Sequence, residues 1–453
     1  MTGLLITTYN RPNYLSLCFE SLLRADLSNI DRIVIVDDNS TDPEVIPLIN
    51  QFSIRVQCNV GTVLKQENKS IKDSLLTGIN NLLEWGCDTF INLDGDAIVR
   101  NDFVDRLLDL KQKYPALIVT GFNCNTLNRD GSIRHKHLYS EPGAIFRESV
   151  GGINMCFHRD QYLKYIKPAL VQTLNYGGNW DALSCKNSMA DSLPIAVTVP
   201  SVVNHIGIKS SMGHDAGGEP ADVADDFKPL ALLNVTLIGV SDGIGQDGIK
   251  GLIKAADIST QNIEFGAVKL LSSWYTTGPD KIRNLGSRQE YSKFIFKELV
   301  NHIDTDYFIL FQADGFILNW KEWTNEFFEY DYIGAPWEWY NDGMQVGNGG
   351  FSFRSKKLHQ LILDEKLELC NDQYIKYFQE DHNISRIHRP FLEGKGIKFA
   401  PVELARKFSI EAWMAPDNQY KGSFGFHGFS VNFHGVQLPY IPYLLPNNKR
   451  EIF

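Results

Sequence analysis

The stretch FINLDGDAIV, residues 90–99, has the pattern of a buried strand that ends in an acidic turn at Asp94, Gly95 and Asp96. Carboxylates rarely end a buried strand unless a partner offsets the cost of removing them from water. A second stretch of this kind, YFILFQADGFIL at residues 307–318, ends in Asp314. Because ligands bind outside the carboxyl ends of strands in open α/β sheets, both turns are candidate ligand sites.

The composition limits the classes of protein to consider. A length of 453 residues exceeds that of a domain built around one hydrophobic core, so the length predicts two domains. Hydrophobic residues make up 43% and charged residues 22%, as in a soluble globular protein. The formal net charge of -10 disfavours a general nucleic-acid binder, which would more often be basic.

Cysteine spacing and hydropathy indicate the compartment. The seven cysteines are scattered singly, which disfavours a disulfide framework or a zinc knuckle and favours reduced thiols in the cytoplasm. The first residues, MTGLLITTYNRP, lack the basic region of a signal peptide, and no apolar run is long enough to span a bilayer. We therefore expect a cytoplasmic protein, with peripheral contact at the inner face of a membrane left open.

Strands and helices alternate in the first half of the chain. This order predicts an α/β fold in which a mostly parallel sheet carries helices on both faces. The predicted strands are residues 3–10, 32–40, 54–60, 89–96 and 116–123, and the predicted helices are residues 12–25, 70–86 and 101–114.

Two polar stretches interrupt this pattern. Residues 123–150 predict a long loop, and residues 210–228, which lack apolar periodicity, predict an interdomain linker. A second series of strands and helices follows, from residue 233 to residue 318. We expect two tandem Rossmann-type domains of one architecture, at residues 1–225 and 229–453.

Two acidic segments of the first half should meet at one edge of the sheet. Asp37 and Asp38 follow the second predicted strand, and Asp94 and Asp96 follow the fourth. Neighbouring carboxylates repel unless a cation lies between them, and Mg²⁺ and Mn²⁺ prefer such oxygen ligands and also hold diphosphates. Two structural alternatives remain: a solvated turn with a helix-capping aspartate, and an Asx-type turn of Asp37 and Asp38 ahead of Ser40.

The segments ITTYNRPNYLSLCFESLL, IVIVDDNSTD and FINLDGD resemble, in order and spacing, the donor domain of family 2 glycosyltransferases. That resemblance implies a GT-A fold, an inverting transfer from a nucleotide sugar and a divalent ion, Mn²⁺ or Mg²⁺. UDP-sugars are the commonest donors of the family. By position, Thr8, Tyr9 and Arg11 would line the nucleotide, Asp37 and Asp38 would bind uracil or ribose, Asp94 would reach ribose or sugar, and Asp96 would bind the metal.

Further residues follow from the same resemblance. Asp181 in GGNWDALSC is the candidate general base, although the family usually has a Glu-Asp pair there, and a role as a helix N-terminal residue is the alternative. Gly151, Gly152 and Trp180 would lie on the acceptor side. His205 is a candidate third metal ligand, with a purely structural role as its alternative, and His214 is a less favoured ligand.

In the second half, the segments DTDYFILFQADGFILNWKEW, YDYIGAPW, VGNGGFSFRS, GIKFAPVELARKFSIE and FGFHG, with the pair Glu380-Asp381, resemble a little-characterised family named as glycosyltransferases from sequence alone. Gln312 replaces the first acid of the turn, so metal use there would need help from His427 in FGFHG. Asp381, beside Glu380, is the candidate base. The predicted donor-binding residues are Asp314, Gly347, Asn348, Gly349 and Gly350, the predicted metal ligands are Asp314 and His427, and Trp337, Trp339 and Tyr340 could stack on sugars or pack in the core.

The leading interpretation is a bifunctional glycosyltransferase that adds sugars to a growing glycan or glycolipid in polysaccharide or glycoconjugate biosynthesis. One alternative is a single catalytic domain fused to an acceptor-binding domain. Another is a sugar nucleotidyltransferase, which would need a glycine-rich basic loop after the first strand, where TTYNRP has none. A third is a lectin-like module without catalysis.

Overall fold

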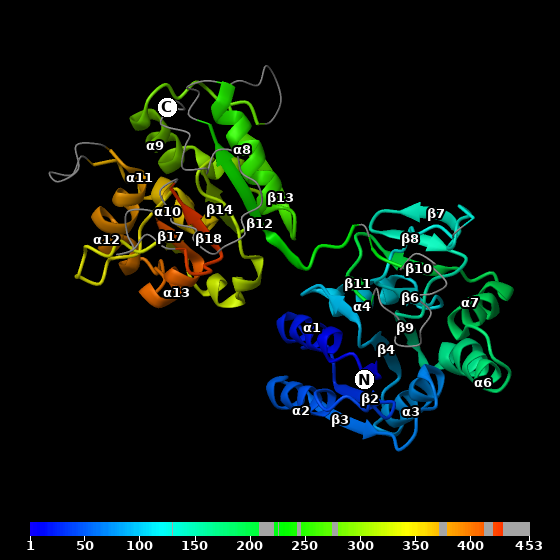
Figure 1. Ribbon diagram of the computed structural model, residues 1–453. Coiled ribbons are helices and arrows are strands. Elements are labelled where there is room, and N and C mark those ends of the chain that lie inside the picture. Colours follow the sequence, from blue (N-terminus) through cyan, green and yellow to red (C-terminus); the bar gives the residue numbers. More distant parts are fainter. Residues whose placement is uncertain are drawn as a thin grey trace. The chain divides into compact units, whose positions relative to one another are not determined.

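The computed structural model describes residues 1–128, 130–207, 222–224, 226–241, 246–273, 280–370, 378–411 and 420–428. Contacts between Cα atoms divide the chain into two compact units, Met1–Ala231 and Leu232–Phe453. Each unit consists of a sheet with helices packed on it (Figure 1). The α/β class is confirmed.

The described residues of the first unit form a nine-stranded sheet in the order β3-β2-β1-β4-β9-β6-β10-β8-β7. The pairs β1–β2, β1–β4 and β2–β3 are parallel, whereas β9 runs antiparallel to β4. The strands are β1 (Thr2–Thr8), β2 (Arg32–Asp37), β3 (Asn59–Leu64), β4 (Thr89–Asp94), β6 (Val119–Thr120), β7 (His137–Glu141), β8 (Ala144–Arg147), β9 (Asn154–His158) and β10 (Ile195–Thr198). Because β1 to β4 run parallel to their neighbours in these three pairs, their carboxyl ends meet at one edge, and β6 and β10 form a further parallel pair.

Helices cover both faces of this sheet because successive strand residues point to opposite sides. Leu4 packs in one core cluster with α1 and α2, and Leu5 packs in the other with α3. A short two-stranded sheet, β5 with β11, lies beside the acidic turn. These elements are α1 (Pro12–Arg24), α2 (Val45–Arg55), α3 (Ile71–Glu84), β5 (Ala97–Val99), α4 (Phe103–Lys113), α5 (Arg159–Gln161), a π-helix (Tyr162–Ile166), α6 (Lys167–Tyr176), α7 (Trp180–Ala190) and β11 (Val203–His205).

Two predictions of local structure in this unit were wrong. Residues 54–60 were expected to form the third strand, but α2 occupies Val45–Arg55 and the strand is Asn59–Leu64. Pro47 lies in the first turn of α2, where proline is tolerated, so it does not end the helix. Residues 123–150 were expected to be a loop, yet β7 and β8 pair as an antiparallel hairpin within them.

The described residues of the second unit form a five-stranded sheet in the order β13-β12-β14-β16-β15. β12 and β14 are parallel, and β16 runs antiparallel to both β14 and β15. The strands are β12 (Leu230–Val240), β13 (Ile263–Leu271), β14 (Tyr307–Phe311), β15 (Tyr332–Gly334) and β16 (Phe351–Ser355), and β17 (Ser409–Glu411) pairs with β18 (Gly425–His427).

Aromatic packing holds the second unit together. Phe294 of α9 packs with Phe308 of β14 in one core cluster. Phe353, Phe408 and Phe424 make ring contacts with one another or with Trp323. The helices are α8 (Gln246–Ser259), α9 (Arg288–Lys297), α10 (Lys356–Asp364), α11 (Glu380–His382), α12 (Arg389–Gly394) and α13 (Val402–Phe408), with 3₁₀ turns at Leu299–His302, Trp320–Glu322 and Asn325–Glu329 and a π-helix at Asn383–Ile387.

Two further features concern the helices and the cysteines. Among the described residues, no helix combines the length and the apolar character that a bilayer crossing requires. All seven cysteines lie in described parts of the chain and have free thiols. Six of them are at least half-buried, and Cys370 is exposed.

The close approach of β15 to the glycine-rich loop yields a stability prediction. A Cβ atom on Gly334 would lie 2.0 Å from the carbonyl oxygen of Asn348, which belongs to the backbone and cannot rotate away. Gly334→Ala should therefore lower the free energy of unfolding of the second unit by about 1–3 kcal/mol. Gly394→Ala is the control, because a Cβ atom there meets nothing within 4 Å.

Calorimetric unfolding of both variants measures the effect. The Gly334→Ala transition should move to lower temperature while that of Gly394→Ala stays at or slightly above the parent value, since alanine favours helix. Equal transition temperatures in the two variants would show that the loop does not press on β15.

Candidate functional site

The turn between β1 and α1 has an unusual backbone. Asn10 and Arg11 have φ angles of 52° and 63°, in the left-handed region that non-glycine residues rarely adopt. Hydrogen bonds hold the turn in place: the Asn10 N–H donates to Ser40 Oγ (2.7 Å), and Asn10 Oδ1 accepts from the N–H groups of Thr41 (2.9 Å) and Asp42 (3.0 Å). The turns after β1 and β2 are thereby tied together, and Arg11 is directed at the acidic turn after β4.

Asp37 and Asp38 both lie buried but have different partners. Asp37 accepts hydrogen bonds from the backbone N–H (2.9 Å) and the hydroxyl (2.5 Å) of Ser40. This is the Asx-type turn that was the structural alternative for this residue. Asp38 pairs with the ammonium group of Lys65 and accepts from the Lys69 N–H (3.0 Å). Lys65 was not anticipated from sequence.

The acidic turn after β4 brings two predicted metal ligands together. Asp96 Oδ2 lies 2.7 Å from Arg11 Nη1 and 3.2 Å from His205 Nε2. Burial opposes ionisation of Asp96, but the hydrogen bond and charge of His205 and the charge of Arg11 outweigh it and lower its pKa. Burial and the charge of Asp96 raise the pKa of Asp94 to about 8, and Thr7 Oγ1 donates to Asp94 (3.3 Å).

A backbone pairing sets His205 opposite the turn. β11 runs antiparallel to β5, with His205 facing Ala97, and the N–H of Ile206 donates to the carbonyl of Asp96 (2.9 Å). Gly207 follows directly, and a Cβ atom there would lie 2.0 Å from Asp96 Oδ2. Glycine at this position therefore allows the backbone to approach the acid, which the sequence alone did not reveal.

Arg11 keeps donors available at this place. Its Nε and Nη2 atoms are buried and have no hydrogen-bond partner within the described part of the chain. A buried guanidinium donor without a hydrogen-bond partner costs free energy, so we expect a partner to bind there. An anion with several oxygens would satisfy them.

The structure places Gly152, a predicted acceptor-side residue, in direct contact with Asp181, the candidate base. The Gly152 N–H donates to Asp181 Oδ2 (3.0 Å), and Asp181 Oδ1 accepts from the Ala182 N–H (2.9 Å) at the start of α7. Trp180 is 7% exposed, and its ring lies where a Cβ atom of Gly152 would be. Trp180 thus supports the glycine turn from the core, and a Cβ atom of Gly151 would lie 3.7 Å from Asp222.

The second unit groups a similar set after β14. His427 Nε2 lies 3.1 Å from Gln312 Oε1 and 3.6 Å from Asp314 Oδ1. Its Nδ1 lies 3.3 Å from Glu411 Oε1, an acid that sequence reasoning missed. Burial opposes protonation of His427, but the charge of Asp314 and the hydrogen bond with Glu411 raise its pKa to about 9. The N–H of Gly428 donates to the carbonyl of Asp314 (2.8 Å).

The candidate base of the second unit is also held by a glycine. The Gly349 N–H donates to Asp381 Oδ2 (3.1 Å), and the His382 N–H donates to Asp381 Oδ1 (2.7 Å). Burial, then the charges of Glu380 and Glu411, raise the pKa of Asp381 to about 7. Arg354, which is fully buried, binds Glu380 (3.2 Å) beneath this loop.

The two units share these contacts in the same register. Leu93, one residue before the first acidic turn, pairs with Asn154, two residues after Gly152. Phe311, one residue before Gln312, pairs with Phe351, two residues after Gly349. In each unit an aspartate of the turn faces a histidine, and a second aspartate at a helix start accepts from a glycine N–H.

The glycine-rich loop of the second unit, which was predicted to bind the donor, uses two of its backbone N–H groups within the protein. The N–H of Asn348 donates to Ala335, and that of Gly349 donates to Asp381. Gly347 and Gly350 instead admit neighbouring rings: a Cβ atom would lie 2.4 Å from Trp337 and 2.1 Å from His427, respectively. The glycines therefore serve close packing.

The remaining predicted positions are placed as follows. Trp337 is buried, whereas Trp339 is 59% exposed beside it, with ring centroids 6.4 Å apart. Tyr340 stacks on the guanidinium of Arg386 at 3.5 Å. Thr8 is buried and its carbonyl accepts from the Asp38 N–H (2.9 Å). His214 lies outside the described residues.

Sequence comparisons match the two units to two different families. Residues 4–171 match the sequence model described as glycosyl transferase family 2. Residues 277–427 match a model described as a protein of unknown function, DUF5672. The second match carries no activity in its description, so the expected naming of that half as a glycosyltransferase is not supported there.

Curated proteins and solved structures that are similar over part of the chain include the following. Glycosyltransferase GlyA of Streptococcus pneumoniae serotype 4 is 28% identical over 139 residues, which is 30% of this chain and 18% of that protein. A crystal structure of GalNAc-T7 with UDP, GalNAc and Mn²⁺ aligns at 11% identity and a TM-score of 0.37, covering 45% of this chain and 43% of that one.

Two structures of S. aureus TarS also align, each over 45% of this chain. Residues 1–349 of TarS with UDP align at 13% identity and a TM-score of 0.34, covering 59% of that chain. The longer TarS structure aligns at 12% identity and a TM-score of 0.32, covering 36% of that chain. The chain thus matches glycosyl transferase family 2 over residues 4–171 and DUF5672 over residues 277–427.

Proposed function

We propose that the first unit is an inverting glycosyltransferase that uses a nucleotide sugar, in the first instance a UDP-sugar, and a hydroxyl acceptor on a glycan or glycolipid. The family 2 match over residues 4–171 supports the reaction class. The observation that carries the proposal is the group formed by Arg11, Asp96 and His205 at the carboxyl end of β4, with Asp181 held separately on Gly152.

The donor set fits a divalent cation. Asp96 Oδ2 and His205 Nε2 are 3.2 Å apart, a separation that two ligands of one ion can have, and oxygen and imidazole nitrogen both suit Mn²⁺. Bound there with the diphosphate, the ion would neutralise charge on the leaving group. The Nε and Nη2 donors of Arg11 would bind diphosphate oxygens. This role would explain why neither donor has a hydrogen-bond partner within the described chain.

Asp181 would act as general base. As the acceptor hydroxyl oxygen bonds to C1 of the sugar, the bond from C1 to the diphosphate oxygen breaks and the hydroxyl proton passes to Asp181. Gly152 and Ala182 each donate one backbone hydrogen bond to this carboxylate, which fixes its orientation. Each carboxylate oxygen retains a lone pair for the incoming hydroxyl.

We extend the proposal to the second unit, because Asp314, His427 and Asp381 hold the same relations as Asp96, His205 and Asp181. Gln312 removes one carboxylate from the turn, while Glu411 supplies another on the far side of His427. The presence of Gln312 in place of an acid supports a weaker dependence of the second site on a metal ion. Two sites in one chain would keep the product of the first transfer at high effective concentration for the second.

The first test targets the metal-binding acid. Asp96→Ala should abolish Mn²⁺-dependent hydrolysis of a UDP-sugar by the full chain, because it removes a ligand and the partner of both Arg11 and His205. Asp109→Ala, an exposed aspartate on α4, is the control and should keep parental activity. A panel of UDP-, GDP-, dTDP- and CMP-sugars with Mn²⁺ or EDTA identifies the donor. Undiminished hydrolysis in Asp96→Ala would exclude this site.

The second test uses the raised pKa of Asp381. A general base must be deprotonated, and its pKa of about 7 means that protonation removes it as the pH falls below that value. The kcat/KM of the second transfer should therefore rise about tenfold per pH unit up to pH 7 and then level off. A profile that is flat through pH 7 would mean that Asp381 does not accept the proton.

A further inference from the structure

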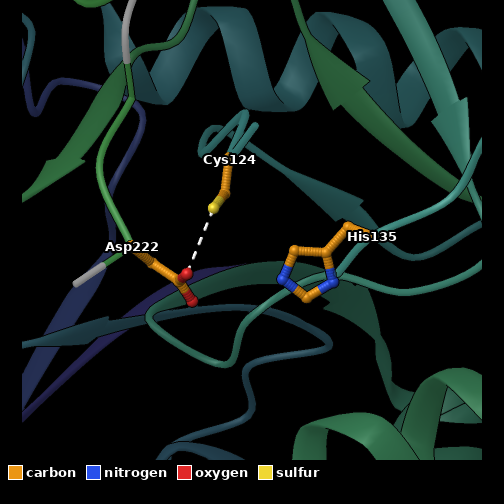
Figure 2. Close-up of side chains that lie close together, drawn as sticks. All are labelled: Cys124, His135 and Asp222. Atoms are coloured by element: carbon orange, nitrogen blue, oxygen red, sulfur yellow. Dashed lines mark hydrogen bonds between the residues drawn. The ribbon is translucent and has the colours of Figure 1, made fainter. Parts of the chain in front are cut away.

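A second group of potential metal ligands lies apart from the acidic turn in the first unit. Cys124, His135 and Asp222, here called the Cys124 cluster, come from three separate segments of the chain (Figure 2). One ligand atom from each lies within 4.8 Å of the other two. Cys124 Sγ is 3.3 Å from Asp222 Oδ1. Among the described residues, this is the group of three that is geometrically able to share an ion.

His135 is oriented as a metal ligand would be. Its Nδ1 lies 3.1 Å from Ser149 Oγ, an interaction that can fix the ring and its tautomer. Its Nε2 is buried and has no hydrogen-bond partner in the described part of the chain. Figure 2 shows the imidazole edge turned toward Cys124 and Asp222. A buried ring nitrogen without a partner indicates that a ligand is missing between these side chains.

The contacts of Asp222 leave room for an ion. Arg134 pairs with Oδ1 of Asp222, the same oxygen that faces Cys124. A carboxylate has two oxygens and about four lone-pair positions, so one arginine contact does not saturate it. Arg134 would then orient Asp222, as outer partners of metal-binding carboxylates do.

We propose that the Cys124 cluster binds a borderline-soft divalent metal ion, for which Zn²⁺ is the best match. Thiolate, imidazole and carboxylate are its preferred ligands, with bonds of about 2.0–2.3 Å, which place ligand atoms about 3.3–3.8 Å apart in a tetrahedron. The three ligand atoms now lie within 4.8 Å of one another, so metal binding requires them to approach by about 1 Å. Cys124 would bind as thiolate after releasing its proton to solvent, and the fourth position is open to water.

The proposed ion is distinct from the one at Asp96 but would act next to it. The backbone carbonyl of Asp222 accepts a hydrogen bond from Nδ1 of His205 (3.1 Å), while Nε2 of the same ring faces Asp96. Binding at the Cys124 cluster would hold Asp222 against His205. The cluster would thereby stabilise the orientation of His205 without entering the proposed donor site.

Cobalt substitution of the full chain tests this site independently of any transfer activity. After removal of metals with a chelator, titration with Co²⁺ should yield a thiolate-to-cobalt charge-transfer band in the near ultraviolet that saturates at one ion per chain, and Zn²⁺ should displace it. The band should persist in Asp96→Ala, because the ligands at Asp96 and His205 include no sulfur. Absence of the band in the parent protein would overturn the proposal.

Variants identify the ligands. Cys124→Ser and His135→Gln should each lose the band or weaken Co²⁺ binding at least tenfold, whereas Cys370→Ser, which changes the exposed thiol, should leave both unchanged. Circular dichroism checks that each variant folds. If Cys124→Ser does not fold, the loss or retention of the band in His135→Gln tests the site. A band that survives both Cys124→Ser and His135→Gln, or that disappears in Cys370→Ser, would contradict the assignment.

Discussion

The candidate sites depend on one backbone hydrogen bond, made once in each unit. The residue after a histidine donates its N–H to the carbonyl of an aspartate in the turn after a buried strand, as Ile206 does for Asp96 and Gly428 does for Asp314. Because this bond fixes the two segments against each other, the imidazole must face the carboxylate. The turn and the histidine strand lie more than a hundred residues apart in each unit, so the site forms only when the unit has folded.

The two sites balance charge in different ways. In the first unit Arg11 and His205 both approach Asp96. Burial and the negative charge of Asp96 raise the pKa of the nearby Asp94 to about 8. In the second unit an uncharged Gln312 occupies the place of Asp94, and protonation of His427 is favoured with a pKa of about 9. We therefore propose a stronger role for a metal ion at the first site, whose turn holds two carboxylates, than at the second, whose turn holds one.

Local patterns predicted most of the strands and the acidic turns, because a buried run ending in acids constrains one short segment. The family resemblance, and not a local pattern, pointed to His205. Contacts between distant segments were beyond this reasoning. Lys65 opposite Asp38 and Glu411 opposite His427 have no signal in their own neighbourhoods. The Cys124 cluster joins three separate positions, and single cysteines favoured isolated thiols. β3 was placed five residues too early, because none of its residues is buried and its sequence lacks the continuous apolar run of β1, β2 and β4.

The central claim is that one chain holds two catalytic sites of one design, and product analysis with the base variants tests it most directly. With both donors and the acceptor present, Asp181→Asn and Asp381→Asn should each slow a different sugar addition about 10²–10⁴-fold, because asparagine keeps the glycine contact but accepts no proton. Mass spectrometry should then detect unmodified acceptor with one variant and a singly extended product with the other. Identical product lengths for the parent and Asp381→Asn would show that the second unit does not catalyse transfer.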